Sequence, residues 1–475
     1  MVFSSLFFVF FFLPLNLCLY YCAKSTPVRN VIMLLFSLIF YAWGEPKFVL
    51  LLISMSFFDW LLSLVVDKHR GRFLSKLALI ATCVIDLGLL GIFKYGTFFQ
   101  ENFQALTGHP SVITQIALPI GISFYTFQLL TYVVDVYRGD VKAERNFFNV
   151  LLYASLFHQC VAGPIVRYQD VAREISNRTV SAADIESGII RFAAGLAKKS
   201  LLANSCGEMA DSLLIAQNIQ TRSAAALWLG MLFFSLQIYL DFSAYSDMAI
   251  GMGRMSGFHY KENFNYPYCS KSISEFWRRW HISLGSFFRD YVYIPLGGNR
   301  KGSIRTITNL LITWMLTGFW HGASWNYLFW GLYYFVFIAL EKLFLDKVLK
   351  KLPAVISRLY TLVVVFFGWV LFKFEDTSVM ITALKGMFCG NANSLTNYET
   401  DINFKSHVFL LIVAVLACMP IAKIIKGMLN SISCKSQSGA LLATVCRTAY
   451  PCAMLLLSTA MLVGDSYNPF LYFQF

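Results

Sequence analysis

The sequence predicts an all-α, polytopic membrane protein, and three observations carry this prediction. Hydrophobic residues make up 57% of the 475 positions and charged residues only 14%, well below the share expected of a soluble protein. Apolar runs of about 20 residues, long enough to cross the hydrocarbon core as helices, recur along the chain. Basic residues gather between these runs, as in the cytoplasmic loops of membrane proteins. Counting whole and partial segments predicts roughly 10 to 13 transmembrane or re-entrant helices.

The first part of the chain alternates apolar spans with basic loops. Residues 3–21 form the first predicted span, because no basic segment precedes them as in a signal peptide. The run 31–66 is long enough for two spans, which Gly44-Glu45-Pro46 separates. An outward span, 77–93, and a return span, 112–136, follow. The return span contains L-P-I-G-I-S-F-Y, a Pro/Gly break that predicts backbone buried in protein or lining a cavity.

The middle of the chain is more polar. The region 147–204 is ambiguous, since its apolar run 150–166 contains His158 and its later part is typical of amphipathic helices at the membrane surface. Residues 224–242 form a clear span. Residues 254–305 carry nine Lys and Arg against three Asp and Glu, so they are predicted to form a cytoplasmic loop.

The remaining chain returns to the first pattern. Four apolar stretches follow the loop, at 307–340, 359–374, 408–425 and 440–463. Placing the basic loops in the cytoplasm puts both termini outside it. Because no internal repeat and no separate soluble segment is evident, residues 1–475 are predicted to form one membrane domain. The loop 254–305 and a catalytic segment, 306–340, belong to it.

Charge and cysteine usage exclude several function classes. The net charge of +13 reflects basic cytoplasmic loops and does not indicate nucleic-acid binding. The 11 cysteines include no C-x-x-C pair and no Cys/His spacing typical of zinc sites. We therefore expect no metal, no bound cofactor and no nucleic-acid partner, and we expect membrane lipid as the surroundings.

A helix is predicted to start at Ser272, because Ser272 and Glu275 have the spacing of a capping box. His281 would lie on the apolar face of that helix. The residues of this face are Trp277, His281, Leu284 and Phe288. An interfacial helix whose histidine only completes a hydrogen-bond network explains the spacing equally well.

A second histidine, His321, lies within an apolar span. Gly318 and Gly322 flank it with a spacing that allows another helix to approach closely. If the segment is helical, Thr317, His321 and Ser324 share a face. Ionisable groups at membrane depth are costly and are more often functional than structural. His321 is therefore the stronger candidate for chemistry.

Other polar features are less specific. The segment P-L-G-G-N-R-K at 295–301 lacks the phosphate-loop pattern, so a tight turn is a better interpretation than a phosphate site. His259 lies in a polar loop and is expected to be solvated. Several aspartates near membrane depth could instead form the proton or ion pathway of a transporter, the second interpretation. These are Asp59, Asp86, Asp135, Asp241 and Asp247.

The motifs W-R-R-W-H-I-S-L and G-F-W-H-G-A-S-W-N resemble those of the membrane-bound O-acyltransferase (MBOAT) family, and more narrowly its bacterial alginate O-acetylation branch. Further matching motifs are F-Y-A-W-G, D-V-Y-R-G, D-F-S-A-Y-S-D-M-A-I-G, R-D-Y-V-Y-I-P-L-G-G-N-R and the closing S-Y-N-P-F-L-Y-F-Q-F. The resemblance implies a helical fold around a membrane tunnel, with His321 as the catalytic histidine and His281 as the second essential residue. The expected tunnel-lining residues are Trp277, Trp320, Ser324 and Asn326.

The resemblance also implies a function. An acetyl group would pass from a cytoplasmic thioester, acetyl-CoA or an acyl carrier protein, to an extracytoplasmic polysaccharide such as alginate or another exopolysaccharide. The setting would be the bacterial cytoplasmic (inner) membrane, with an extracytoplasmic acetyltransferase or esterase-like partner protein. A D-alanyl transferase of the teichoic-acid type is the alternative within the family.

The chemistry agrees with that expectation. An alcohol is a poor nucleophile at neutral pH, and a neutral imidazole can take its proton. We expect His321 to be that base, while His281 orients a substrate or stabilises charge on the carbonyl oxygen. Basic residues near His281 would attract an anionic donor. These are Lys271, Arg278, Arg279, Arg300 and Lys301.

Overall fold

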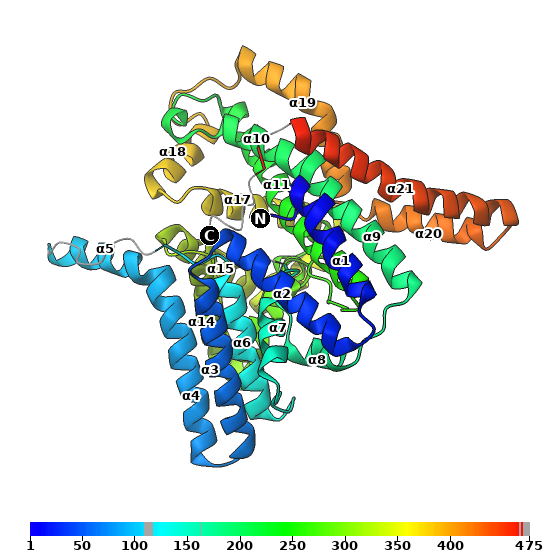
Figure 1. Ribbon diagram of the computed structural model, residues 1–475. Helices are drawn as coiled ribbons and strands as arrows, with labels where there is room; N and C mark the ends of the chain where they lie inside the picture. Colours follow the sequence, from blue (N-terminus) through cyan, green and yellow to red (C-terminus); the bar gives the residue numbers. More distant parts are fainter. Residues whose placement is uncertain (109–116, 162, 465–466, 469–475) are drawn as a thin grey trace. The chain divides into compact units, whose positions relative to one another are not determined.

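The computed structural model describes residues 1–108, 117–161, 163–464 and 467–468. The described residues form helices and no strand (Figure 1), which confirms the predicted all-α class. They divide into two compact units, each made from two segments of the chain. Unit 1 comprises Met1–Phe192 and Ser246–Glu262, and unit 2 comprises Ala193–Tyr245 and Asn263–Phe475.

Unit 1 is built mainly from the N-terminal helices. They are η1 (Phe8–Phe12), α1 (Leu13–Cys22), α2 (Thr26–Gly44), α3 (Val49–Lys68), α4 (Phe73–Leu90), η2 (Gly91–Tyr95), α5 (Gly96–Thr107), α6 (Ile122–Arg138), α7 (Phe147–Ser155), α8 (Tyr168–Ser176) and α9 (Ala182–Ala197). Here η1 and η2 are π-helical turns that continue into their neighbouring α-helices. Helices α3, α4 and α6 pack against one another, and α3 and α4 run side by side in Figure 1.

The predicted Pro/Gly break is present at the start of α6. Gly121 precedes the helix with a left-handed φ of 77°. A Cβ at this position would lie 2.6 Å from the carbonyl oxygen of Cys160, so the turn requires glycine for both conformation and space. The break therefore lies against other protein backbone, as expected of irregular structure at membrane depth. The predicted return span begins at 112–116, which lies outside the described residues.

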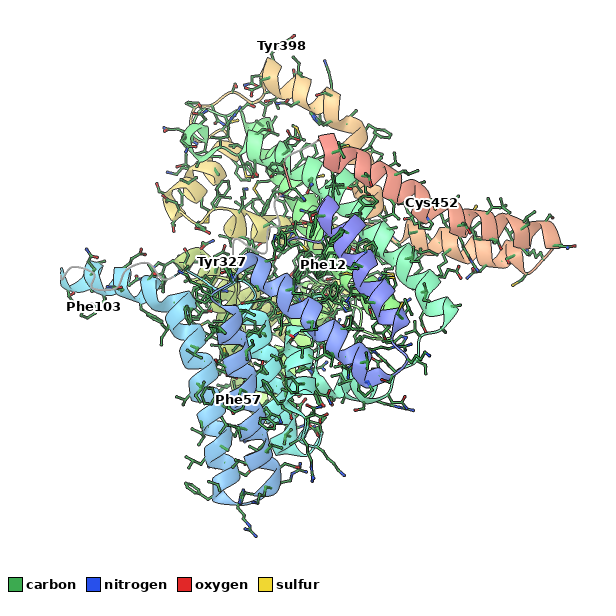
Figure 2. The ribbon with its side chains drawn as sticks, viewed as in Figure 1. Phe12, Phe57, Phe103, Tyr327, Tyr398 and Cys452 are labelled. Atoms are coloured by element: carbon green, nitrogen blue, oxygen red, sulfur yellow. The ribbon has the colours of Figure 1, made fainter. Side chains whose placement is uncertain are left out.

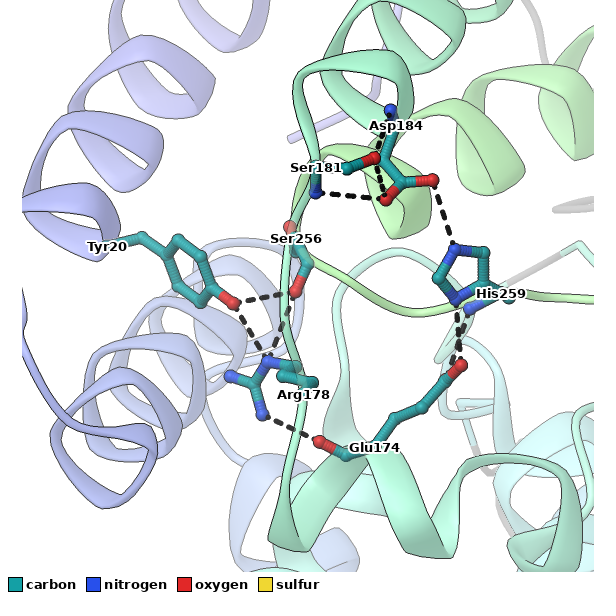
Figure 3. Close-up of polar contacts among 7 residues, drawn as sticks. All are labelled: Tyr20, Glu174, Arg178, Ser181, Asp184, Ser256 and His259. Atoms are coloured by element: carbon teal, nitrogen blue, oxygen red, sulfur yellow. Dashed lines mark hydrogen bonds and ion pairs between the residues drawn. The ribbon is translucent and has the colours of Figure 1, made fainter.

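Arg178 holds together distant segments of unit 1 (Figure 3). Its Nε donates to the hydroxyl of Tyr20 at 2.8 Å and to the carbonyl oxygen of Ser256 at 3.1 Å. The Tyr20 hydroxyl also donates to the Ser256 carbonyl at 2.7 Å. Arg178 is only 5% exposed, so these partners are what makes burial of its charge tolerable.

His259 lies between two carboxylates of unit 1 (Figure 3). Its Nδ1 is 2.8 Å from Glu174 Oε1 and its Nε2 is 3.3 Å from Asp184 Oδ1. Burial alone would lower the pKa of His259, but the hydrogen bonds and charges of the two acids outweigh it and raise that pKa. The expectation of a solvated ring is therefore wrong in part, since the half-exposed ring is bound on both sides.

Unit 2 contains the remaining helices. They are η3 (Lys198–Ala203), α10 (Asn204–Leu213), η4 (Ala216–Asn218), α11 (Ala224–Met255), η5 (Pro267–Cys269), α12 (Ile273–Arg279), α13 (Ile282–Phe287), η6 (Phe288–Tyr293), α14 (Gly302–His321), α15 (Trp325–Leu340), η7 (Glu341–Leu345), α16 (Asp346–Leu349), α17 (Ala354–Lys373), α18 (Thr377–Met387), α19 (Tyr398–Ala417), α20 (Ile421–Ser433) and α21 (Gln437–Gly464). Two of the three chain boundaries between the units fall within α9 and α11, and the third follows Glu262, between α11 and η5.

Lys199 lies at the end of the stretch predicted to form amphipathic helices at the membrane surface. It is buried in η3, with its Nζ 2.7 Å from Asp241 Oδ1 of α11. The helix is π-helical from Lys198 to Ala203, which changes the face that each residue presents relative to a regular α-helix. The ion pair with Lys199 explains why the carboxylate of Asp241 can be buried in α11.

Eight helices of the described residues are long and apolar enough to cross a membrane. They are Thr26–Gly44, Val49–Lys68, Phe73–Thr107, Ala224–Met255, Trp325–Leu349, Ala354–Lys373, Tyr398–Ala417 and Gln437–Gly464. Eight is fewer than the predicted 10 to 13 because that number included partial segments, and α6, for example, has only 17 residues. The chain is thus a multi-pass membrane protein.

Exposure of large apolar side chains agrees with a lipid-facing surface. Phe57 and Phe103 are exposed, whereas Phe12 and Tyr327 are buried (Figure 2). Helix α11 differs from the others, because 83% of its apolar window is buried inside protein, compared with 11% for α19 and for α21. Lipid would cover the exposed apolar side chains, and α11 is an interior helix.

Candidate active site

His281 lies at a break between two short helices of unit 2. Helix α12 ends at Arg279 and α13 begins at Ile282, while His281 between them has a left-handed backbone with φ 43° and ψ 56°. The prediction of one helix carrying both Trp277 and His281 on a common face is therefore wrong. A distant residue holds the chain at this break, since the carbonyl oxygen of Asn263 accepts a hydrogen bond from the Ile282 amide at 2.9 Å.

The predicted start of α12 is confirmed. Ser272 Oγ accepts a hydrogen bond from the Glu275 amide at 3.0 Å, as a helix N-cap does. The reciprocal half of the capping box is displaced by one residue, because Glu275 Oε2 accepts from the amide of Lys271 at 2.9 Å. The helix thus begins where the Ser/Glu spacing indicated.

A buried carboxylate also holds this end of α12. Glu341 of η7 is 2% exposed, and it accepts from the amides of Ile273 at 2.6 Å and Ser274 at 2.8 Å. The first amides of a helix have no intrahelical partner and carry partial positive charge, so an anion is stabilised there. Tyr360 donates to the same carboxylate at 3.2 Å. Glu341 therefore anchors the short helix that leads to His281.

The side chain of His281 is held in one tautomer. Its Nδ1 lies 3.2 Å from Asn263 Oδ1. The same oxygen accepts from the amide of Ser283 at 3.2 Å and from its hydroxyl at 2.8 Å. The amide donor fixes this Asn263 atom as the oxygen, so Nδ1 of His281 carries the proton. Burial lowers the pKa of His281 to about 3, which keeps the ring neutral with Nε2 as its acceptor nitrogen.

His321 is the last residue of α14 and is 5% exposed. Its ring lies in an aromatic cage, with ring centroids 5.0 Å from Trp320, 4.9 Å from Trp330 and 5.4 Å from Phe372. The prediction that Ser324 shares a helical face with His321 is wrong, because α14 ends at His321 and Ser324 precedes α15.

The close helix approach predicted around His321 is confirmed at Gly318, whereas Gly322 lies beyond the end of α14, against the ring of Tyr327. A Cβ on Gly318 would lie 2.3 Å from the carbonyl oxygen of Tyr327, and one on Gly331 would lie 2.4 Å from that of Trp314. These two glycines let α14 and α15 meet backbone to backbone. The contact places His321 at the end of α14 against Trp330 of α15.

Trp320 links the two histidines. Its ring centroid lies 5.0 Å from that of His321 and 6.1 Å from that of His281. Phe242 of α11 covers the other side of His281, with ring centroids 4.7 Å apart. The fold therefore brings two histidines from separate sequence motifs into one aromatic cluster of unit 2. An imidazole that is neutral and shielded from water is suited to accepting a proton from an alcohol.

The predicted tunnel-lining residues divide into two groups. Trp277 and Trp320 belong to the cluster, since the Trp277 ring lies 5.3 Å from that of Trp330. Asn326 is buried, but its Nδ2 donates to the Leu371 carbonyl at 3.3 Å, and Ser324 precedes α15. A cavity of about 410 Å³ in unit 2 is lined by neither histidine. The tunnel stays a prediction.

The predicted donor-binding residues lie mainly at the surface. Lys271, Arg278, Arg300 and Lys301 are exposed. Arg279 instead forms an ion pair with Glu275 at 2.7 Å and donates to the Asn265 carbonyl at 3.2 Å. The two glycines between Pro295 and Lys301 have left-handed φ values, as a tight turn requires. Whether the exposed basic residues bind a donor stays a prediction.

Two residues of this site escaped sequence reasoning. Asn263 is 18 positions from His281, a separation that no helical or strand period connects. Glu341 could have been recognised from the sequence, because a lone acid directly after the apolar run 307–340 can indicate a buried carboxylate. Its partner, the start of α12, lies 67 and 68 positions away and could not have been inferred.

Comparison with known proteins identifies the family. The sequence profile of MBOAT, the membrane-bound O-acyltransferase family, matches residues 144–382. A relative from Pseudomonas putida named probable alginate O-acetylase AlgI is 37% identical, with both chains fully covered. A peptidoglycan O-acetyltransferase from Helicobacter pylori is 29% identical over all of this chain and 98% of its own. A teichoic acid D-alanyltransferase from Bacillus subtilis is 28% identical over 54% of this chain and 67% of its own. The matched segment contains both histidines and their aromatic cluster, and the chain belongs to the membrane-bound O-acyltransferase family and is an acyltransferase.

Proposed function

We propose that this protein transfers an acetyl group from a cytoplasmic thioester donor to an extracytoplasmic polysaccharide, from within the bacterial inner membrane. The observation that carries the proposal is the pair of buried histidines whose rings both contact that of Trp320. Similarity over the whole chain to proteins named as O-acetylating enzymes supports the acetyl group and the polysaccharide. The match to teichoic acid D-alanyltransferases covers about half of the chain, which favours acetyl over D-alanyl transfer.

The reaction assigns a separate role to each histidine. His321 takes the proton of an acceptor hydroxyl while that oxygen attacks the thioester carbonyl carbon. The carbon–sulfur bond then breaks, and the proton passes to the departing sulfur as a thiol. His281 is neutral with Nδ1–H held by Asn263. Its Nε2 therefore accepts a hydrogen bond and orients a substrate group that can donate one, such as the acceptor hydroxyl. The alternative role, stabilisation of charge on the carbonyl oxygen, would require Nε2–H, which this tautomer lacks.

The donor is acetyl-CoA or an acetylated acyl carrier protein, both of which are anionic. Lys271, Arg278, Arg300 and Lys301 are exposed on the loop that carries His281, and cationic side chains at this site would raise the local donor concentration. Arg279 contributes less, because Glu275 already neutralises it. The basic loops face the cytoplasm in this proposal, as the positive-inside rule predicts.

The acceptor side requires a second protein. We infer an extracytoplasmic acetyltransferase or esterase-like partner that receives the acetyl group and modifies alginate or another exopolysaccharide. This inference rests on the family resemblance of the motifs around His281 and His321.

Replacement of His321 tests the proposal. A strain that lacks the chromosomal gene should regain wild-type acetylation of its extracellular polysaccharide when it expresses the intact chain. With His321→Ala, the acetyl content should fall by about 10²-fold or more, while the amount of protein in the membrane stays the same. His407→Ala is the matched control, because among the described residues His407 of α19 bonds to its near neighbours Asn403 and Ser406. Full acetylation by the His321→Ala chain would overturn the catalytic role.

A further inference from the structure

Two aspartates of unit 1 are buried, and neither pairs with a cation among the described residues. Asp59 of α3 and Asp86 of α4 are both 0% exposed. None of their four carboxyl oxygens is in hydrogen-bond geometry with a donor of the described residues. Both lie within helices that are long and apolar enough to cross a membrane. The acyl transfer proposed above uses neither of them.

The two carboxyl groups face each other across the contact between α3 and α4. Each carboxyl group adjoins the other, and the Thr82 hydroxyl adjoins Asp59. Thr82 precedes Asp86 by one helical turn, is 0% exposed and has no other hydrogen-bond partner among the described residues. Three buried polar groups from two helices therefore converge on one point.

The described residues around the pair offer it no positive charge. The titratable side chains near the pair are Cys83 of α4 and Tyr125 of α6, with Tyr41 of α2 beyond Tyr125. Lys94 of η2 lies within the same long helix as Asp86, but its Nζ contacts the Ser123 hydroxyl at 3.4 Å. Two carboxylates without a cation cannot both remain ionised at low dielectric, because each charge loses its hydration and repels the other.

We propose that Asp59 and Asp86 form a proton-binding site, in which the carboxylic acid of one residue donates to the carboxyl oxygen of the other. A proton from water adds to a carboxylate oxygen, and the O–H formed provides the donor that both carboxyl groups lack. Thr82 can donate to the oxygen that remains. Two facing acids that share protons in this way are the arrangement expected of closely spaced carboxyl groups.

A metal cation is a poorer occupant of this point. Hard cations in proteins are held by about six or more oxygens, and the pair with Thr82 offers five. No group of three or more His, Cys, Asp and Glu able to hold a metal ion occurs in the part of the chain that the structure describes. A proton needs only the two carboxyl groups that are present.

Infrared spectroscopy of the full-length protein in lipid nanodiscs tests the proposal. At neutral pH the wild type should show the C=O stretching band of a carboxylic acid, which shifts in D2O. Asp59→Asn/Asp86→Asn should lose this band, whereas Asp346→Asn should keep it, because Asp346 is an exposed acid paired with Lys350. Identical spectra for the wild type and the double variant would overturn the proposal. So would loss of the band on addition of Na⁺, which would identify a cation site.

The single variant Asp59→Asn keeps the test decisive if the double variant does not fold. Its amide can donate to Asp86 as the acid did, so the protein should reach the membrane in wild-type amount. The remaining acid should give a band at a changed frequency. An unchanged band would show that the signal comes from another group, and the proposal would fail.

Discussion

At the scale of single residues, the state of His281 follows from its surroundings. The ring is 1% exposed, and burial disfavours its charged form. Asn263 then decides which nitrogen carries the remaining proton, because its oxygen accepts from Nδ1. Sequence spacing identified His281 as a candidate but could not indicate this partner. The hydrogen bond between Asn263 and His281 depends on a fold that joins residues 18 positions apart.

Replacing Asn263 should impair catalysis through His281. Asn263→Ala removes the acceptor that holds Nδ1–H, so the ring can rotate or change tautomer, and we expect acetyl transfer to fall by about 10- to 100-fold. Asn263→Asp keeps an acceptor oxygen and adds a negative charge, which should raise the pKa of His281. Its activity should therefore recover in part, with a pH–rate profile displaced from that of the wild type. A purely structural role would leave the shape of that profile unchanged.

His259 should make stability depend on pH. Its folded-state pKa is raised above the ordinary value of 6.5, because Glu174 and Asp184 stabilise the protonated ring. The stabilisation is therefore complete below about pH 6.5 and is lost as the pH rises through the folded-state value. Because the ring is half exposed, it should amount to less than about 1 kcal/mol.

Thermal unfolding in detergent measures this effect. The wild type should unfold at a higher temperature than His259→Gln near pH 6, and the difference should disappear at alkaline pH. His407→Gln serves as the control, since no carboxylate pairs with His407 among the described residues. A difference between wild type and His259→Gln that grows with pH would contradict the assignment.

At the scale of helices, local sequence signals and long-range contacts contribute differently. The start of α12 was predictable, because Ser272 caps the helix as the Ser/Glu spacing indicates. Its end was not, since the break at His281 depends on Asn263. The approach of α14 to another helix was also predictable from small residues around His321. The structure was needed to show that α14 meets α15 and that Gly331 allows the contact.

The contact between α14 and α15 predicts a strong effect of a single methyl group. Gly318→Ala would place a Cβ 2.3 Å from the Tyr327 carbonyl oxygen, so the helices would have to separate. We expect a loss of about 1–3 kcal/mol in the free energy of unfolding, together with reduced activity. Gly88→Ala in α4 is the control, because nothing lies within 4 Å of its Cβ. That change should leave stability equal or raise it by about 0.4–1 kcal/mol. Equal stability of the Gly318→Ala and Gly88→Ala variants would contradict the close packing of α14 against α15.

At the scale of the whole molecule, composition was sufficient to predict the class of the protein but not its division into two compact units. Apolar runs and basic loops predicted a helical, multi-pass membrane protein, and they did so because length and hydropathy are local properties. The division into two units was not predictable. Each unit joins segments that are distant in sequence, and the partners of Arg178 and Lys199 are of this kind.

The proposed orientation predicts the outcome of reporter fusions. A fluorescent protein that folds only in the cytoplasm should be bright when fused after Lys68, in the basic loop that follows α3. Alkaline phosphatase, which is active only outside the cytoplasm, should be active when fused after Glu45. The same two reporters exchanged between the sites are the controls and should be inactive. The opposite pattern would reverse the predicted topology of the N-terminal helices of unit 1.

The interleaving of the two units constrains how the nascent protein can mature. Unit 1 needs Ser246–Glu262, which the ribosome adds only after more than 50 intervening residues, Ala193–Tyr245, of the other unit have been made. Until then the guanidinium of Arg178 lacks the carbonyl of Ser256, and Glu174 lacks the imidazole of His259. A nascent chain arrested before residue 246 should therefore expose these charges, and the first half of the protein can mature only while the second is already entering the bilayer.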